Sequence, residues 1–135
     1  MNIRFAFATR RVEFALAALV GLLTACSQAP QTPLATTVCE LPAHAQRTVQ
    51  IDATVSVDSE GKTLISDSDC PATQLELRLS TAASRAGAAE QLKSAAQQAV
   101  SAGNSRFPVR LTGVYTSAPA GTYFVADSVS AAPPR

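Results

Sequence analysis

The chain has 135 residues, of which 11 are basic, 10 are acidic and 47% are hydrophobic. This length accommodates one small domain with a terminal extension and excludes two domains of ordinary size. The near balance of charge disfavours a strongly basic nucleic-acid-binding protein.

The first 25 residues have the composition of an export signal. Arg10 and Arg11 precede an uncharged run from Phe14 to Ala25, in the order of a positive n-region and an apolar h-region. The run has 12 residues, whereas a helix that spans a bilayer needs about 20. We therefore expect residues 1–25 to be cleaved off as a signal peptide. Three arginines and Glu13 would leave with it, so the 11 basic and 10 acidic residues would fall to 8 and 9.

The residues at the end of this run, Leu23-Thr24-Ala25-Cys26, resemble the lipobox of bacterial lipoproteins. The resemblance implies that a diacylglycerol is attached to the Cys26 thiol, that the chain is cleaved before Cys26, and that the new amino terminus is acylated. Ser27 stands where an Asp favours inner-membrane retention in lipoproteins of enterobacterial type. The resemblance thus implies a lipid-anchored protein of the bacterial cell envelope, at the outer membrane. The alternative is an ordinary secretory signal with a coincidental cysteine.

An uncharged segment with two prolines, residues 27–37, follows the lipobox and has no apolar periodicity. This composition predicts a linker. We therefore expect a lipidated tether over residues 26–37, a globular domain over 38–130 and a frayed tail over 131–135.

Two cysteines remain once Cys26 is lipidated, and the envelope is an oxidising compartment. We predict a Cys39–Cys70 disulfide, which would stabilise the fold by roughly 3–4 kcal/mol on the chain-entropy account. A redox pair or a metal site is disfavoured, because the chain has no Cys-x-x-Cys spacing and only one histidine, His44.

Three strands are predicted in the first half of the domain. Residues 48–57 alternate between apolar and polar side chains, which is typical of a half-buried strand. A turn at residues 58–61 leads into a second strand over 63–66. After a break at residues 67–71, alternating leucines over 75–79 predict the third.

The pattern then changes to a helix and two more strands. Small and apolar residues recur at spacings of three and four from Ala88 to Val100, with Ser84 or Gly87 as the start and Gly103 near the end. Alternation over residues 107–115 and 123–129 predicts strands on either side of a turn at 117–121. The order β-β-β-α-β-β matches the OB-fold, a five-stranded, partly open Greek-key barrel. The alternative is an open α+β sandwich with one helix packed across an antiparallel sheet.

The arrangement strand-Gly-strand-Asp-x-x-Cys-Pro, from Gly61 through Pro71, resembles a group of uncharacterised bacterial envelope proteins. That resemblance implies no known activity.

Four residues are candidates for a binding surface. Tyr115 and Tyr123 flank the last predicted hairpin, and Asp67 and Asp69 carry alternate carboxylates as calcium-binding loops do. The rest of a calcium loop is missing, so we interpret the two aspartates as turn formers and predict no metal site.

The sequence predicts a binding protein rather than an enzyme. His44 is the only histidine, and no acid–base pair is recognisable, so we expect no catalytic residue and no cofactor. The chain has no Trp and no basic stripe, which disfavours nucleic acid. We expect a non-enzymatic binding or assembly module, attached to the membrane through the lipid on Cys26, whose partner is an envelope protein or a glycan. The alternative is an inhibitor that plugs a hydrolase with the loop 117–121 or 67–71.

Overall fold

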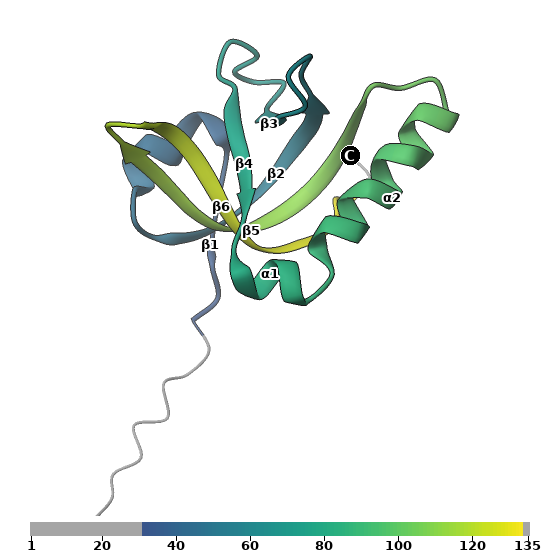
Figure 1. Cartoon of the computed structure of the whole chain (residues 1–135). Coiled ribbons are helices and arrows are strands. Elements are labelled where there is room, and N and C mark those ends of the chain that lie inside the picture. The colour runs from purple at the N-terminus through teal and green to yellow at the C-terminus, as the bar shows by residue number, and fades with distance from the viewer. Residues whose placement is uncertain (1–30, 134–135) are drawn as a thin grey trace, which may run out of the picture. The chain divides into compact units, whose positions relative to one another are not determined.

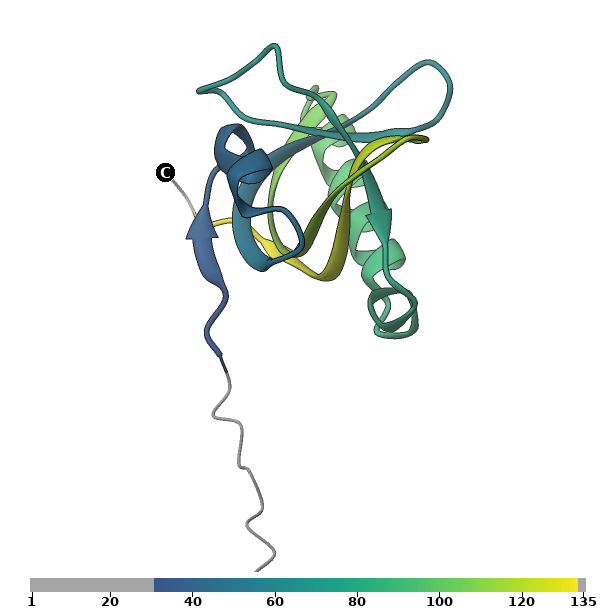
Figure 2. The same ribbon diagram turned by 90° about the vertical axis from the view of Figure 1, so that its left-hand side faces the viewer.

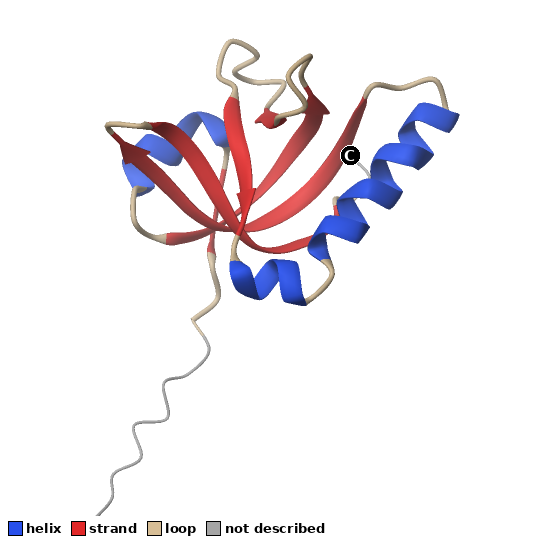
Figure 3. Ribbon diagram, viewed as in Figure 1, coloured by secondary structure: helices blue, strands red, loops and turns tan. Residues whose placement is uncertain are grey.

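A six-stranded sheet dominates residues 31–133, the part of the chain that the computed structural model describes (Figures 1 and 3). The predicted signal peptide, Cys26 and the first part of the predicted tether lie outside these residues. The elements in chain order are β1 (Leu34–Thr36), the 3-10 helix η1 (Val38–His44), β2 (Thr48–Val57), β3 (Thr63–Ser66), β4 (Leu75–Leu79), α1 (Thr81–Arg85), α2 (Ala88–Ser101), β5 (Arg106–Ala118) and β6 (Gly121–Ala131).

Five of the strands close into a barrel. They follow the order β2-β3-β4-β6-β5, and β5 pairs back onto β2 from Arg106 to Val114. β4 and β6 are parallel, and the other four pairings around the barrel are antiparallel. Figure 2 shows the strands wrapping around a common interior. The OB-like barrel is thus confirmed, and the open sandwich is excluded because β2 and β5 are joined.

The alternation of the sequence fills this interior. Val49, Ile51, Ala53 and Val55 of β2 point inward and are buried. Burial of one large aliphatic or aromatic side chain contributes about 1.5–3 kcal/mol. The side chains that share the core with β2 come from each of the other four barrel strands and from η1: Val38, Leu41, Ile65, Leu75, Leu77, Phe107, Val109, Leu111, Tyr115, Phe124 and Ala126.

A register shift in β6 changes which of its residues face inward. Thr112 of β5 pairs with Ser128 and Gly113 pairs with Ala126, so Asp127 is the extra residue of a β-bulge. Phe124 and Ala126 are buried before the bulge, and Val129 packs against the core after it. The strands approach closely here: a Cβ on Gly113 would lie 2.8 Å from the Cα of Ala126 and closer still to the carbonyl oxygen of Val125.

The folded part begins earlier than the sequence predicted. β1 lies within the predicted tether and pairs in parallel with β2, Leu34 opposite Val49. The helix η1 follows β1 in the chain, and its residues Val38 and Leu41 are completely buried. The folded domain therefore begins several residues before the predicted boundary at residue 38. The sequence did not predict β1, because three paired residues are too few to show a clear alternation in an uncharged segment.

Two helices join β4 to β5, although only one was predicted. The Ser80 hydroxyl oxygen accepts a hydrogen bond from the Ala83 backbone N–H at 3.1 Å and caps the short helix α1. Gly87, at φ +82°, separates α1 from α2, so α2 begins after Gly87 rather than at Ser84. α2 runs beside the strands at one side of the barrel (Figure 1) and packs Leu92, Ala95, Ala96 and Ala99 against the core. No helix within residues 31–133 is long and apolar enough to cross a membrane.

Candidate functional site

The two candidate tyrosines lie on opposite faces of the β5–β6 hairpin. Tyr115 pairs with Phe124 and is 7% exposed, so it belongs to the core. Tyr123 pairs with Thr116 and is half-buried, on the outer face. The predicted surface shared by Tyr115 and Tyr123 is therefore not formed. The inward orientation of Tyr115 could be predicted from the sequence, because Tyr115 is an even number of residues from Phe107 and Leu111 in the same strand.

Tyr123 belongs instead to an outer patch with residues from β3 and β4, which we call the tyrosine patch: Leu64, Glu76, Arg78 and Tyr123. In the ladder, Glu76 lies between Leu64 and Tyr123. The guanidinium carbon of Arg78 is 4.0 Å from the centroid of the Tyr123 ring, which is cation–π geometry.

Arg78 also forms an ion pair with Glu76. Its Nε donates to Oε1 of Glu76 at 2.8 Å. This hydrogen bond lowers the pKa of the Glu76 carboxyl from its ordinary value and raises the pKa of the Arg78 guanidinium. The patch thus presents a stacked ring and cation with a charged carboxylate beside them on a solvent-exposed face.

The two candidate aspartates lie in the loop between β3 and β4. Asp67 is 5% exposed, and its Oδ1 accepts hydrogen bonds from the Asp69 backbone N–H at 3.1 Å and from the Ser68 hydroxyl at 3.3 Å. This is the geometry of an Asx turn. Asp69 itself is exposed. Within residues 31–133, no group of three or more His, Cys, Asp or Glu side chains could hold a metal ion.

The predicted disulfide joins Cys39 of η1 to Cys70, which lies in the same loop. The loop 67–71 is therefore fixed at both ends, by the buried Asp67 and by the covalent bond at Cys70. The other candidate loop is much shorter than expected. Ala118 pairs with Gly121, so only Pro119 and Ala120 form the turn between β5 and β6.

A bidentate ion pair that the sequence analysis did not identify lies on the outer face of β2 and β5. Nε and Nη2 of Arg110 donate to the two carboxylate oxygens of Asp52 at 2.7 and 2.9 Å. The hydrogen bond raises the pKa of Arg110. Both residues occupy outward positions in predicted strands, but their pairing required the β2–β5 register. This pair lines a hollow of about 230 Å³ together with Asp67, Asp69 and the residues around Thr36.

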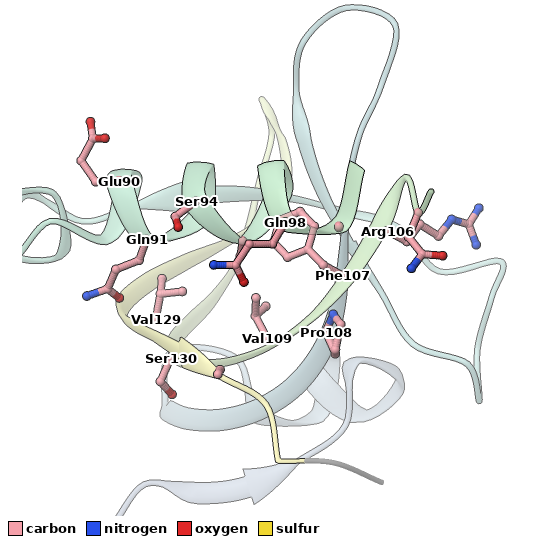
Figure 4. Close-up of a pocket in the computed structure, with 14 residues that line it drawn as sticks. Glu90, Gln91, Ser94, Gln98, Arg106, Phe107, Pro108, Val109, Val129 and Ser130 are labelled. Atoms are coloured by element: carbon pink, nitrogen blue, oxygen red, sulfur yellow. The ribbon is translucent and has the colours of Figure 1, made fainter. Parts of the chain in front are cut away.

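A hollow of about 770 Å³, which we call the α2 groove, lies between α2 and the strands β5 and β6 (Figure 4). Phe107, Val109 and Val129 lie on the strand side, and Ala95 and Ala99 lie on the helix. The remaining lining residues are polar or charged apart from Pro108 and Ala131: Glu90, Gln91, Ser94, Gln98, Asn104, Arg106, Pro108, Ser130 and Ala131.

A second, more apolar hollow of about 370 Å³ flanks the other side of α2 and shares Phe107 with the α2 groove. α2 therefore contacts the barrel along a narrow line of alanines and Leu92. The sequence indicated the narrow face of this helix. It did not indicate the hollows, because their width depends on the distance at which the helix lies from the strands.

Comparisons with protein-family models, with curated proteins and with solved structures found no match for this chain.

Proposed function

We propose that this chain is a lipid-anchored binding module of the bacterial cell envelope, with no catalytic role. The observation that carries the proposal is the Cys39–Cys70 disulfide. It uses two of the three cysteines in the sequence, and the third is Cys26, in the lipobox-like Leu23-Thr24-Ala25-Cys26. The pairing leaves the thiol that lipid attachment requires.

The disulfide also favours an exported protein. Disulfides persist in oxidising compartments such as the bacterial periplasm and are rare in the cytosol. The chain opens with cations and a short apolar run, as export signals do. Ser27 after the lipidated position favours the outer membrane over the inner membrane.

The proposed role in binding rests on the outer surface of the barrel. OB-fold barrels bind oligosaccharides or oligonucleotides across their second and third strands, which correspond here to β3 and β4. That face carries the tyrosine patch, in which Arg78 lies over the ring of Tyr123. An aromatic ring with flanking charged groups suits a glycan or a protein surface. The proposed partners are therefore an envelope protein or a glycan.

The mass of the native protein tests the anchor. The protein is extracted from membranes, and its intact mass is measured without reduction and again after reduction and alkylation. We expect a chain that begins at Cys26, carries acyl groups, and takes up two alkyl groups only after reduction. An unlipidated mass, or alkylation without reduction, would overturn the proposal.

A matched pair of variants tests the attachment site. Cys26→Ala should move the protein from the membrane fraction to the soluble fraction, while Ser27→Ala, one position along, should leave it in the membrane. In intact cells, crosslinking should trap one specific envelope protein or glycan. Labelling that equals that of an unrelated lipoprotein would contradict a binding role.

The loop 67–71 supports a second candidate function, inhibition of a hydrolase. Asp67 and the Cys39–Cys70 bond hold this loop in one conformation, and preorganisation lowers the cost of binding. Deletion of the gene should then sensitise cells to at least one hydrolase in a panel. Unchanged sensitivity to every hydrolase would exclude this function.

A further inference from the structure

The C-terminal part of β6 has a paired strand on one side only, among the strands of residues 31–133. β4 pairs with β6 from Tyr123 to Ala126, whereas β5 pairs with it from Gly121 as far as Ala131. The Ala126 carbonyl oxygen accepts a hydrogen bond from the Ser80 backbone N–H at 2.9 Å, where the chain leaves β4. Beyond Ala126, the edge of β6 opposite β5 is not paired with a strand of residues 31–133, and the helices α1 and α2 pack against β6. A strand edge of this kind presents backbone N–H and C=O groups to any chain laid beside it.

This edge borders the α2 groove. Val129, Ser130 and Ala131 line one side of the groove, and α2 lines the other. Figure 4 shows Gln91 and Gln98 pointing from the helix toward the strands. Together with Ser94 they form a row of uncharged hydrogen-bonding groups at helical spacing. An extended backbone lying in the groove would thus meet hydrogen-bonding groups on both sides.

We propose that the α2 groove binds an extended segment of a partner polypeptide, which adds to the edge of β6 as a further strand. The inference rests on the proposed function as a binding module, but it does not depend on the lipid anchor. In strand addition, main-chain hydrogen bonds provide affinity and pockets for alternate side chains provide specificity. Here Phe107, Val109 and Val129 form the apolar floor for those side chains.

The charges around the groove define the chemistry of the segment. Glu90 and Arg106 lie at opposite ends of the groove and point away from its centre (Figure 4). Every other lining residue is uncharged, and burial of an unpaired charge is costly. The bound residues are therefore uncharged and alternately apolar, with a basic residue beyond the Glu90 end and an acidic residue beyond the Arg106 end. The part of β6 that lines the groove, Val129–Ala131, provides space for roughly three extended residues.

The binding test uses the purified mature protein and a defined probe. The probe is a seven-residue peptide with blocked ends, Lys and Glu at its two termini and alternating Val and Thr between them, made in both chain directions. Titration calorimetry should detect binding of at least one direction. The same peptide N-methylated at every residue retains its side chains but cannot donate backbone hydrogen bonds. Its affinity should be lower by about tenfold or more.

A matched pair of variants locates the binding site. Gln98→Trp places a large ring in the groove, whereas Gln97→Trp places the same ring at an exposed position of α2 that does not line the groove. Gln98→Trp should weaken peptide binding by about tenfold or more, and Gln97→Trp should leave it unchanged. If Gln98→Trp does not fold by circular dichroism, Ser94→Phe, which also fills the groove from an exposed helix position, replaces it.

Four outcomes overturn the proposal, three of them in the binding experiments. These three are the absence of binding in both chain directions, binding of the N-methylated peptide with the affinity of the unmodified one, and equal effects of the two variants on peptide binding. Light scattering tests for a second copy of this chain as the occupant: a dimer that Gln98→Trp dissociates and Gln97→Trp preserves would also overturn it. Because the mass measurement tests the anchor independently, failure here leaves the lipid-anchor part of the proposed function intact.

Discussion

Removal of the disulfide should cost this domain a large part of its stability. Cys39 and Cys70 are 31 residues apart in sequence, and a closed loop of that length restricts the unfolded chain by about 3.7 kcal/mol on the chain-entropy account. Cys70 also packs against the core, so the replacement of both cysteines by alanine removes some apolar contact as well. We therefore expect Cys39→Ala/Cys70→Ala to lower the free energy of unfolding by about 4 kcal/mol.

Urea denaturation followed by circular dichroism measures this loss. With an m-value of about 1.5 kcal/mol/M, the midpoint should fall by about 2–3 M. The native protein in reducing agent provides the control, because it should match the double variant, and the variant should not respond to reductant. A midpoint shift below about 0.5 M would refute the reasoning, since it would mean that the loop between the two cysteines is already restricted in the unfolded chain.

Three further changes test the local structure. Gly113→Ala should destabilise the protein by about 1–3 kcal/mol in thermal or urea unfolding, because its Cβ would collide with the backbone of β6; unchanged stability would show that the two strands can separate there. Ser80→Ala should lower the free energy of unfolding by about 1 kcal/mol through loss of the α1 cap. Thr81→Ala, at the neighbouring exposed position, should lower it by less. The hydrogen bond from Arg78 lowers the pKa of Glu76 from its ordinary value, so the stabilisation from this pair is present above the ordinary pKa of a Glu carboxyl and is lost as the pH falls through the lowered value. Glu76→Gln should therefore reduce the urea midpoint at about pH 7 and have a smaller effect at about pH 2.5, and an equal effect at both pH values would contradict the pairing.

The strands β2, β3 and β4 could be predicted from the sequence to the residue. Each has one buried face, so hydrophobic alternation with a period of two identifies both the element and its inward side. β6 shows where this signal fails. Its alternation changes face at Asp127, and only the β5 register reveals that the residue is a bulge. The face of Tyr123 therefore could not be assigned from β6 alone.

Most of the candidate site depends on distances between elements, which a single sequence does not encode locally. Asp52 and Arg110 are 58 residues apart and become partners only because β5 closes the barrel onto β2. The α2 groove exists because a helix with an alanine face lies against strands that carry Phe107. The Asx turn at Asp67, by contrast, uses neighbours within two residues, and its composition was sufficient to predict it.

The position of the disulfide determines how the domain bears mechanical load. A pull on its N-terminal end reaches β1 first, which is held to β2 by three residue pairs. If β1 peels away, the tension arrives at Cys39 and passes through the covalent bond to Cys70, in the connection between β3 and β4. The 30 residues between the two cysteines, which include most of η1 and all of β2, are bypassed. The load thus enters the barrel beside its third strand, and β2 cannot be drawn out from its N-terminal end while the bond is intact.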